Sequence, residues 1–186
     1  MTLSVIATIA PKERVDHPLV VERIFAAPRD LVWKAWTESE HLKHWWGPKG
    51  YRLTVASLDL RPGGVFHYGL TSPKGDEMWG RFVYREIDAP RRLVYVSSFT
   101  DKLGKLTRHP MSATWPLEVM NTLTLAEENG STKLTISARP FCATETESRI
   151  FNNSHDSVHG GLQGTFAQLD DYLAKLMIRE YMEAPE

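Results

Sequence analysis

Two histidines at helical spacing are the most obvious candidates for metal chemistry in this sequence. His155 and His159 stand four residues apart, which places both side chains on one face of a helix. Such a pair can bind zinc when a third ligand comes from elsewhere, but no glutamate follows the first histidine as it does in zinc proteases. Because two ligands alone are a weak signal, we favour a polar helical turn near the mouth of a pocket, and we expect no bound metal.

An asparagine in a predicted strand is the best candidate for a polar contact with a ligand. Strand alternation places Asn121 on the apolar face of the stretch 115–126, together with three leucines and a valine. A buried amide needs a hydrogen-bond partner. One interpretation is a ligand deep in a pocket. The other, which base rates favour, is a neighbouring side chain or a buried water.

Common catalytic motifs are absent from the sequence. It has no nucleophile elbow, phosphate-binding glycine loop, CxxC pair or dinucleotide fingerprint. We therefore expect no catalytic set and no cofactor. A cyclase or isomerase needs only one or two polar groups in an apolar pocket, so an enzyme using Asn121, Tyr84, His67 or a histidine of the last helix remains the alternative.

Composition narrows the class of protein further. The 186 residues are 42% hydrophobic and 24% charged, with a formal net charge of −1, which suits one globular domain. There is no basic surplus to attract nucleic acid, no apolar run long enough to insert in a membrane and no signal-peptide pattern. The single cysteine, Cys142, excludes an internal disulfide and is consistent with a reducing compartment, so we expect a cytoplasmic location.

The chain order predicts strands on either side of a tryptophan-rich helical stretch. Four of the six tryptophans fall within residues 27–48, which we interpret as two short helices, the first over 29–37 and the second ending at Gly47-Pro48. We expect an N-terminal arm over 1–18, one domain over 19–178 and a polar tail over 179–186. Period-two alternation and turn residues predict the following strands: 19–25, 51–60, 65–70, 77–87, 92–99, 115–126 and 131–141.

A helical period begins near Glu145 and continues to the end of the domain. Gly160, Gly161 and Gly164 interrupt its pattern, which predicts either a break near Gly160 or a close approach of the helix to another backbone. The connection Thr100–Thr114 is long and polar, and its role as a lid or as an ornamental loop stays open.

Hairpin-linked strands followed by a helix predict an α+β fold. A curved antiparallel sheet of about six or seven strands would wrap around the long C-terminal helix and leave a cavity between them. The orientation of strand 77–87 is undecided, because both of its faces carry large residues. The residues we predict to line the cavity are Trp46, Phe66, Tyr68, Trp79, Tyr84, Tyr95, Phe99, Val119, Asn121, His159 and Gln163.

The order of elements and several motifs resemble the START/SRPBCC superfamily, and within it the family related to the C-terminal domain of the heat-shock protein 90 ATPase activator. The resemblance covers about residues 20–175. Its motifs are Ala27-Pro28, Val32-Trp33, Ala35-Trp36-Thr37, Leu42, Trp45-Trp46-Gly47-Pro48, Asp59-Leu60-Arg61-Pro62-Gly63-Gly64, Ser72-Pro73-Lys74-Gly75, Glu86-Ile87, Arg92-Leu93 and the Asn-Gly hairpin before Thr132. It implies a helix-grip fold with a hydrophobic cavity, in a family whose members have diverse functions.

We therefore expect the protein to bind a small apolar, aromatic or lipid-like molecule between the sheet and the last helix. The alternatives are an enzyme of the cyclase or isomerase type that uses the same cavity, or a module that contacts and regulates a chaperone, which only the family name implies. A homodimer is a further expectation, and we expect no nucleic acid partner.

Overall fold

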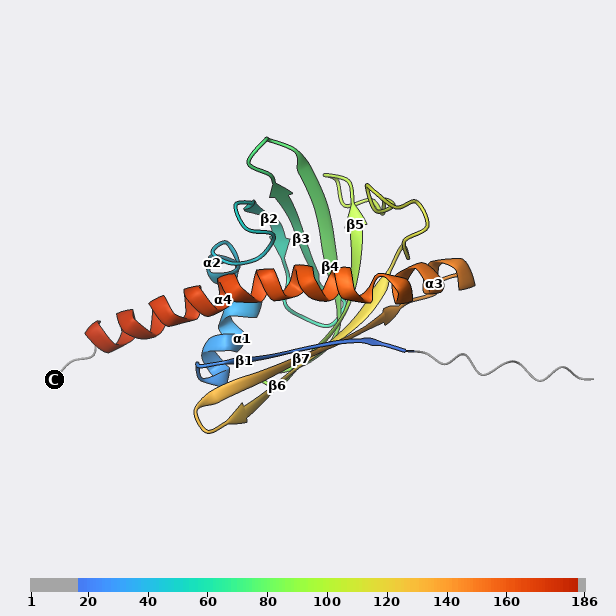
Figure 1. Cartoon of the computed structure of the whole chain (residues 1–186). Helices are drawn as coiled ribbons and strands as arrows, with labels where there is room; N and C mark the ends of the chain where they lie inside the picture. Colours follow the sequence, from blue (N-terminus) through green and yellow to red (C-terminus); the bar gives the residue numbers. More distant parts are fainter. Residues whose placement is uncertain (1–16, 184–186) are drawn as a thin grey trace, which may run out of the picture.

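A computed structural model describes residues 17–183, which form a seven-stranded sheet and four helices (Figure 1). The strands are β1 Leu19–Phe25, β2 Arg52–Leu58, β3 Val65–Thr71, β4 Glu77–Asp88, β5 Arg92–Thr100, β6 Val119–Glu128 and β7 Ser131–Pro140. The helices are α1 Arg29–Thr37, α2 Ser39–Leu42, α3 Glu145–Asn153 and α4 His155–Glu183. Most of the predicted arm 1–18 lies outside the described residues, and α4 continues beyond residue 178 into the predicted tail.

The sheet is antiparallel throughout, in the order β1-β7-β6-β5-β4-β3-β2. Five neighbouring pairs follow one another in the chain, and β1 closes the other edge by pairing with β7. In Figure 1 the sheet curves around α4, which crosses its concave side. The predicted α+β helix-grip fold is confirmed.

Helix α1 forms because its apolar residues recur at helical spacing after a proline that presets the first turn. Leu31, Val32, Ala35 and Trp36 are buried, and Pro28 stands at the N-cap. Helix α2 is shorter than predicted. It ends at Leu42, and Trp45 and Trp46 lie in the turn that follows.

Side-chain and backbone contacts fix α4 to the rest of the fold. Arg23 of β1 donates to Asp170 and to Gln163 of the helix. Gln168 donates to the backbone oxygen of Gly47 over 2.7 Å. Phe166 packs edge-on against Phe25, with ring centroids 6.1 Å apart. These contacts attach the helix to the β1 edge of the sheet and to the turn after α2.

The predictions for the glycines of the last helix were wrong. The break lies at Ser154, between α3 and α4, and its hydroxyl donates to the Ile150 carbonyl over 2.8 Å. Gly160, Gly161 and Gly164 lie in one continuous helix, and a Cβ added at any of them would have no described atom within 4 Å. The break therefore comes six residues before Gly160, and no other backbone lies within 4 Å of the place where a side chain would stand on these glycines.

The long connection between β5 and β6 is longer than predicted. Strand β6 begins at Val119 instead of Trp115, so the loop includes Trp115, Pro116 and Leu117. Its first part extends the edge of β5 through an isolated bridge between Thr100 and Leu106. It thus forms a folded structure at the end of β5.

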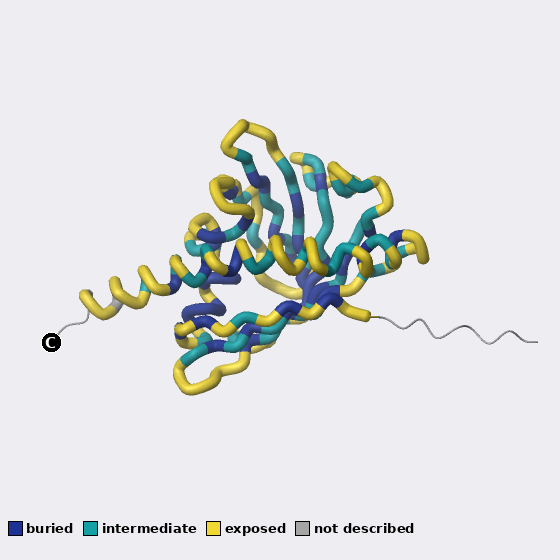
Figure 2. Tube along the Cα trace, in the orientation of Figure 1, coloured by how far each residue is buried: buried dark blue, intermediate teal, exposed yellow. Residues whose placement is uncertain are grey.

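The core lies between the concave face of the sheet, α1 and α4 (Figure 2). Its fully buried side chains include Trp45, Phe25, Phe151, Phe166 and Leu169. Within residues 17–183, no helix combines the length and apolarity needed to span a membrane.

Candidate functional site

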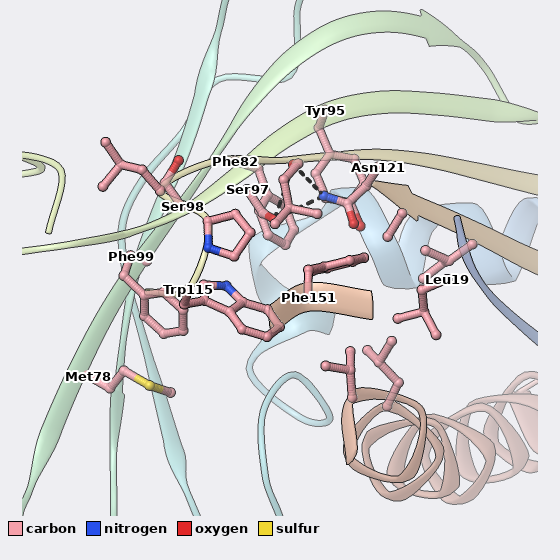
Figure 3. Close-up of a pocket in the computed structure, with 18 of the residues that line it drawn as sticks. Leu19, Met78, Phe82, Tyr95, Ser97, Ser98, Phe99, Trp115, Asn121 and Phe151 are labelled. Carbon is pink, nitrogen blue, oxygen red and sulfur yellow. Dashed lines mark hydrogen bonds between the residues drawn. The ribbon is translucent and has the colours of Figure 1, made fainter. Parts of the chain in front are cut away.

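A cavity of about 220 Å³ lies between the sheet and the N-terminal half of α4 (Figure 3). All of the strands except β2 contribute to it, together with the β5–β6 loop, the turn after α2, α3 and α4. Its lining residues are Leu19, Trp46, Tyr68, Met78, Trp79, Gly80, Phe82, Tyr95, Ser97, Ser98, Phe99, Trp115, Pro116, Leu117, Val119, Asn121, Ile136, Ala138, Phe151, Val158 and Leu162.

The structure brings seven of the eleven predicted residues together around this cavity. They are Trp46, Tyr68, Trp79, Tyr95, Phe99, Val119 and Asn121. Phe66 and Tyr84 do not line it, since both are 1% exposed and packed within the core. Gln163 instead exchanges hydrogen bonds with Arg23 and the Glu22 backbone, and His159 is exposed.

The register of the sheet settles the orientation of β4. Tyr68 pairs with Gly80, and Phe66 with Phe82, so the even-numbered residues of β4 face the cavity. Trp79 borders the cavity, but its indole ring lies on the opposite face, over Gly69 and 5.2 Å from the His67 ring centroid. His67 is therefore on the outer face, away from the cavity.

Stacked aromatic rings form the cavity wall on β3, β4 and β5. Phe82 stacks on Tyr95 with centroids 4.3 Å apart, and Trp46 meets Phe82 edge-on at 5.4 Å. Burial raises the pKa of Tyr68 to about 12 and also raises the pKa of Tyr95. Both phenols are therefore neutral at physiological pH, and the wall carries no charge.

A second aromatic row runs along the mouth of the cavity. The ring of His109, in the loop, lies between the rings of Phe99 and Trp115, with centroid distances of 4.7 Å and 5.6 Å. The Trp115 ring in turn contacts that of Phe151 in α3, with centroids 5.4 Å apart. The Met111 backbone N–H donates to His109 Nδ1 over 3.0 Å, and burial lowers the pKa of this histidine. The ring is therefore held in its neutral form.

An ion pair joins the same loop to α3. Arg108 donates both to Glu147 and to the backbone oxygen of Trp115. Glu147 also forms a capping box with Thr144 at the start of α3. The Thr144 backbone N–H and then Arg108 lower the pKa of the Glu147 carboxyl. One buried carboxylate thus connects the loop to the helix beside the cavity mouth.

Asn121 is a buried polar side chain of the lining, and it is 8% exposed. Its amide nitrogen donates to Ser97 Oγ and to the Val119 carbonyl, both over 2.9 Å. The amide nitrogen therefore finds both of its partners within the protein, as the interpretation favoured by base rates expects for that end of the group. Figure 3 shows both bonds on the nitrogen, with the oxygen pointing away from them.

The two histidines considered as metal ligands, His155 and His159, have different surroundings at the start of α4. His159 is exposed, whereas the half-buried His155 packs against Phe151 with ring centroids 5.3 Å apart. Within residues 17–183, no three histidine, cysteine or acidic side chains are grouped as metal ligands.

Fourteen lining residues were not predicted, and some of them had a usable signal. Phe82 lies on the same face of its strand as Met78, and Ser97 on the same face as Tyr95 and Phe99. Choosing one face for each strand would therefore have identified both Phe82 and Ser97. Val158 and Leu162 belong to the apolar helical stripe. The position of Trp115 depends on the folded loop, for which the sequence has no periodic signal.

Comparison with known proteins agrees with this architecture. The family described as Activator of Hsp90 ATPase homolog 1-like protein matches residues 26–174. A crystal structure of a Mycobacterium smegmatis protein has a TM-score of 0.66 and 25% identity, over 83% of this chain and 88% of that one. A Nitrosomonas europaea protein has a TM-score of 0.68 and 25% identity, over 87% and 96%. No curated protein matches the chain.

Proposed function

The chain belongs to the Activator of Hsp90 ATPase homolog 1-like family, and from this premise we propose that its cavity binds a small, neutral aromatic or apolar molecule. The observation that carries the proposal is the lining. Among the described residues around the cavity, none has an acidic, basic or imidazole side chain. An ionised group inside would lack a partner for its charge, at a cost of several kcal/mol.

The size of the cavity limits the ligand to one or two rings or a short acyl chain. A dry apolar cavity of about 150 Å³ is enough to bind benzene. The present cavity, at about 220 Å³, leaves room for a second fused ring or a short substituent. The stacked wall of Phe82 and Tyr95 favours a flat aromatic body, because aromatic pairs gain energy beyond the area they bury.

The groups around the cavity support binding more than turnover. The lining has hydroxyl, amide and phenol groups. Burial raises the pKa of Tyr68 and that of Tyr95, which takes both further from neutral pH. A general acid or base works best with a pKa near the working pH. Of the histidines considered for catalysis, His67 is on the outer face of the sheet and His159 is exposed. His155 packs against Phe151 but does not line the cavity.

The proposal is tested by native mass spectrometry of protein purified without added ligand, followed by melting curves with a panel of neutral aromatics. We expect a retained small molecule, or a rise of the melting temperature with ring-sized probes. A ligand at about 100 times its Kd adds about 2.7 kcal/mol of stability.

Two substitutions on neighbouring residues of β7 make a matched pair for this test. Ala138→Phe fills the cavity, whereas Ser137→Phe adds the same ring on the opposite face of the sheet. The Ala138 variant should lose the ligand-induced shift and the Ser137 variant should keep it. Equal shifts in both, or no shift in the unmodified protein with any probe, would contradict cavity binding.

A further inference from the structure

We propose that Asn121 selects the ligand by accepting a hydrogen bond from it, so that the ligand is a neutral aromatic molecule with an O–H or N–H group, such as a phenol or an indole. This inference rests on the proposed function, because it names the chemistry of a molecule bound in the same cavity. It depends on the fixed orientation of one amide.

Chemistry alone determines which end of the Asn121 amide faces Val119. The Val119 carbonyl oxygen can only accept a hydrogen bond, so the amide atom 2.9 Å from it must be the NH₂ group. The second proton of that group is donated to Ser97 Oγ, also over 2.9 Å. A flip of the amide would bring its oxygen against the Val119 carbonyl oxygen and lose that bond, whereas the Ser97 hydroxyl could still donate to the flipped oxygen. The amide nitrogen is therefore fully used, and the oxygen must point to the other side.

The amide oxygen is the part of Asn121 that remains free to bind. The residue is 8% exposed and lines the cavity, so its small accessible area faces the ligand space. Within residues 17–183, no N–H or O–H group donates to this oxygen. The oxygen is not among the fully enclosed, unpartnered side-chain atoms of the described residues, so it keeps surface open to the cavity, and a ligand with a donor gains a hydrogen bond there that a ligand without one lacks.

The neighbours of Asn121 leave room for a ring beside its oxygen. In the sheet, Asn121 lies between Tyr95 on β5 and Ala138 on β7. The side chain of Ala138 is a single methyl group, so it takes up little space beside Asn121. Tyr95, on the other side, presents an aromatic surface. A flat ligand can therefore lie against Tyr95 with its donor directed at the oxygen.

The test compares three probes of nearly the same shape. Indole has an N–H donor, indene has a CH₂ group in that place, and benzofuran has an oxygen that can only accept. Titration calorimetry on the unmodified protein, Asn121→Leu and Thr122→Leu gives the ratio of the Kd of indene to that of indole. Thr122 neighbours Asn121 on the same strand but faces the other side of the sheet.

We expect this ratio to fall about tenfold in Asn121→Leu and to stay unchanged in Thr122→Leu. Benzofuran should behave like indene. A ratio that changes less than about twofold in Asn121→Leu overturns the inference, although cavity binding would still stand. If none of the three probes binds the unmodified protein, the proposed function fails for ring-sized ligands and the inference fails with it.

A second measurement keeps the test decisive if Asn121→Leu does not fold. In the unmodified protein, the NMR signal of the Asn121 side-chain carbonyl carbon reports directly on hydrogen bonding to its oxygen. Indole should shift this signal further downfield than indene does. The same shift with both probes overturns the inference.

Discussion

The ring of Tyr68 lies directly over Gly80 on the neighbouring strand, so that a Cβ on residue 80 would stand 3.0 Å from the phenol oxygen. The two residues are directly paired in the sheet, on the face that lines the cavity. The accessible part of Tyr68 borders this cavity, while Trp46, Phe66 and Phe82 contact the rest of its ring. The absence of a side chain at residue 80 therefore sets the position of the cavity wall.

Gly80→Ala is expected to destabilise the protein by about 1–3 kcal/mol, because the enclosed ring of Tyr68 has little room to move. Urea unfolding measures the change. Gly69→Ala is the comparison on the outer face, where the new Cβ would stand 2.8–3.0 Å from three carbons of the half-buried Trp79 ring. That ring can move toward solvent, so the loss should be smaller. A Gly80→Ala variant as stable as the unmodified protein would show that the Tyr68 ring is not confined.

Protonation of His109 should destabilise the loop at the cavity mouth. Burial lowers the pKa of this histidine in the folded protein, and its Nδ1 accepts a bond from Met111 that the charged ring would lose. The unfolded chain therefore takes up the proton first. The stability contributed by the neutral ring is complete above the ordinary pKa of 6.5, and it falls as the pH falls through that value.

His109→Phe tests this, since it keeps the aromatic contacts with Phe99 and Trp115 but cannot titrate. Urea unfolding at about pH 7.5 and about pH 5.5 should show a smaller loss of stability in the variant. The lowered pKa of Glu147 changes the stability of the protein only when the pH falls below 4.5, the ordinary pKa of a glutamate, and this lies outside the pH window of the experiment. Equal pH dependence in both proteins would exclude His109 as the titrating group.

The ion pair between Arg108 and Glu147 should slow the exchange of a ligand through the mouth. The Arg108 side chain is 49% exposed and that of Glu147 is 11% exposed, so solvent partly screens the pair and it contributes about 0.5–1 kcal/mol. Arg108→Gln should therefore speed ligand dissociation about two- to fivefold. Glu147→Gln should act in the same way. Its amide oxygen can still accept the hydrogen bond from the Thr144 backbone N–H that caps α3.

Stopped-flow dissociation of a bound probe measures this rate, and Arg61→Gln serves as the control. Arg61 pairs with Asp59 over 2.9 Å at the exposed turn before β3, and neither residue lines the cavity. Unchanged dissociation in the Arg108 and Glu147 variants would mean that the loop does not control entry, and it would favour the ornamental role.

The fold was predictable because each element has its own period. Alternation located the strands to within about two residues, except for the start of β6, and the buried set Leu31, Val32, Ala35 and Trp36 located α1. The start of β6 was missed because Trp115 and Leu117 continue the alternation. Their contacts instead belong to the folded loop, where Arg108 binds the Trp115 carbonyl.

The cavity was only partly predictable, because alternation assigns a face of a strand but not a depth along it. Phe66 and Tyr84 share the inner face with Tyr68 and Phe82, yet they lie in the packed part of the core. On α4, Val158 and Leu162 line the cavity, while the residue after each of them, His159 and Gln163, is rotated about 100° away. The rotation of a helix against a sheet depends on long-range contacts such as that between Arg23 and Asp170.

The three glycines of α4 weaken this helix, and a side chain at any of them would meet no described atom outside the helix's own backbone. Each exposed helical glycine costs about 0.5–1 kcal/mol relative to alanine. Gly160, Gly161 and Gly164 are all exposed, and a Cβ on any of them would meet open space. Replacing all three by alanine should therefore stabilise the protein by about 2 kcal/mol, measured by urea unfolding.

Because Val158 and Leu162 of the same segment line the cavity, the stiffer helix should also slow ligand exchange. Increased stability with unchanged exchange would show that opening occurs at the loop alone, and unchanged stability would mean that the glycines do not lie within a regular helix.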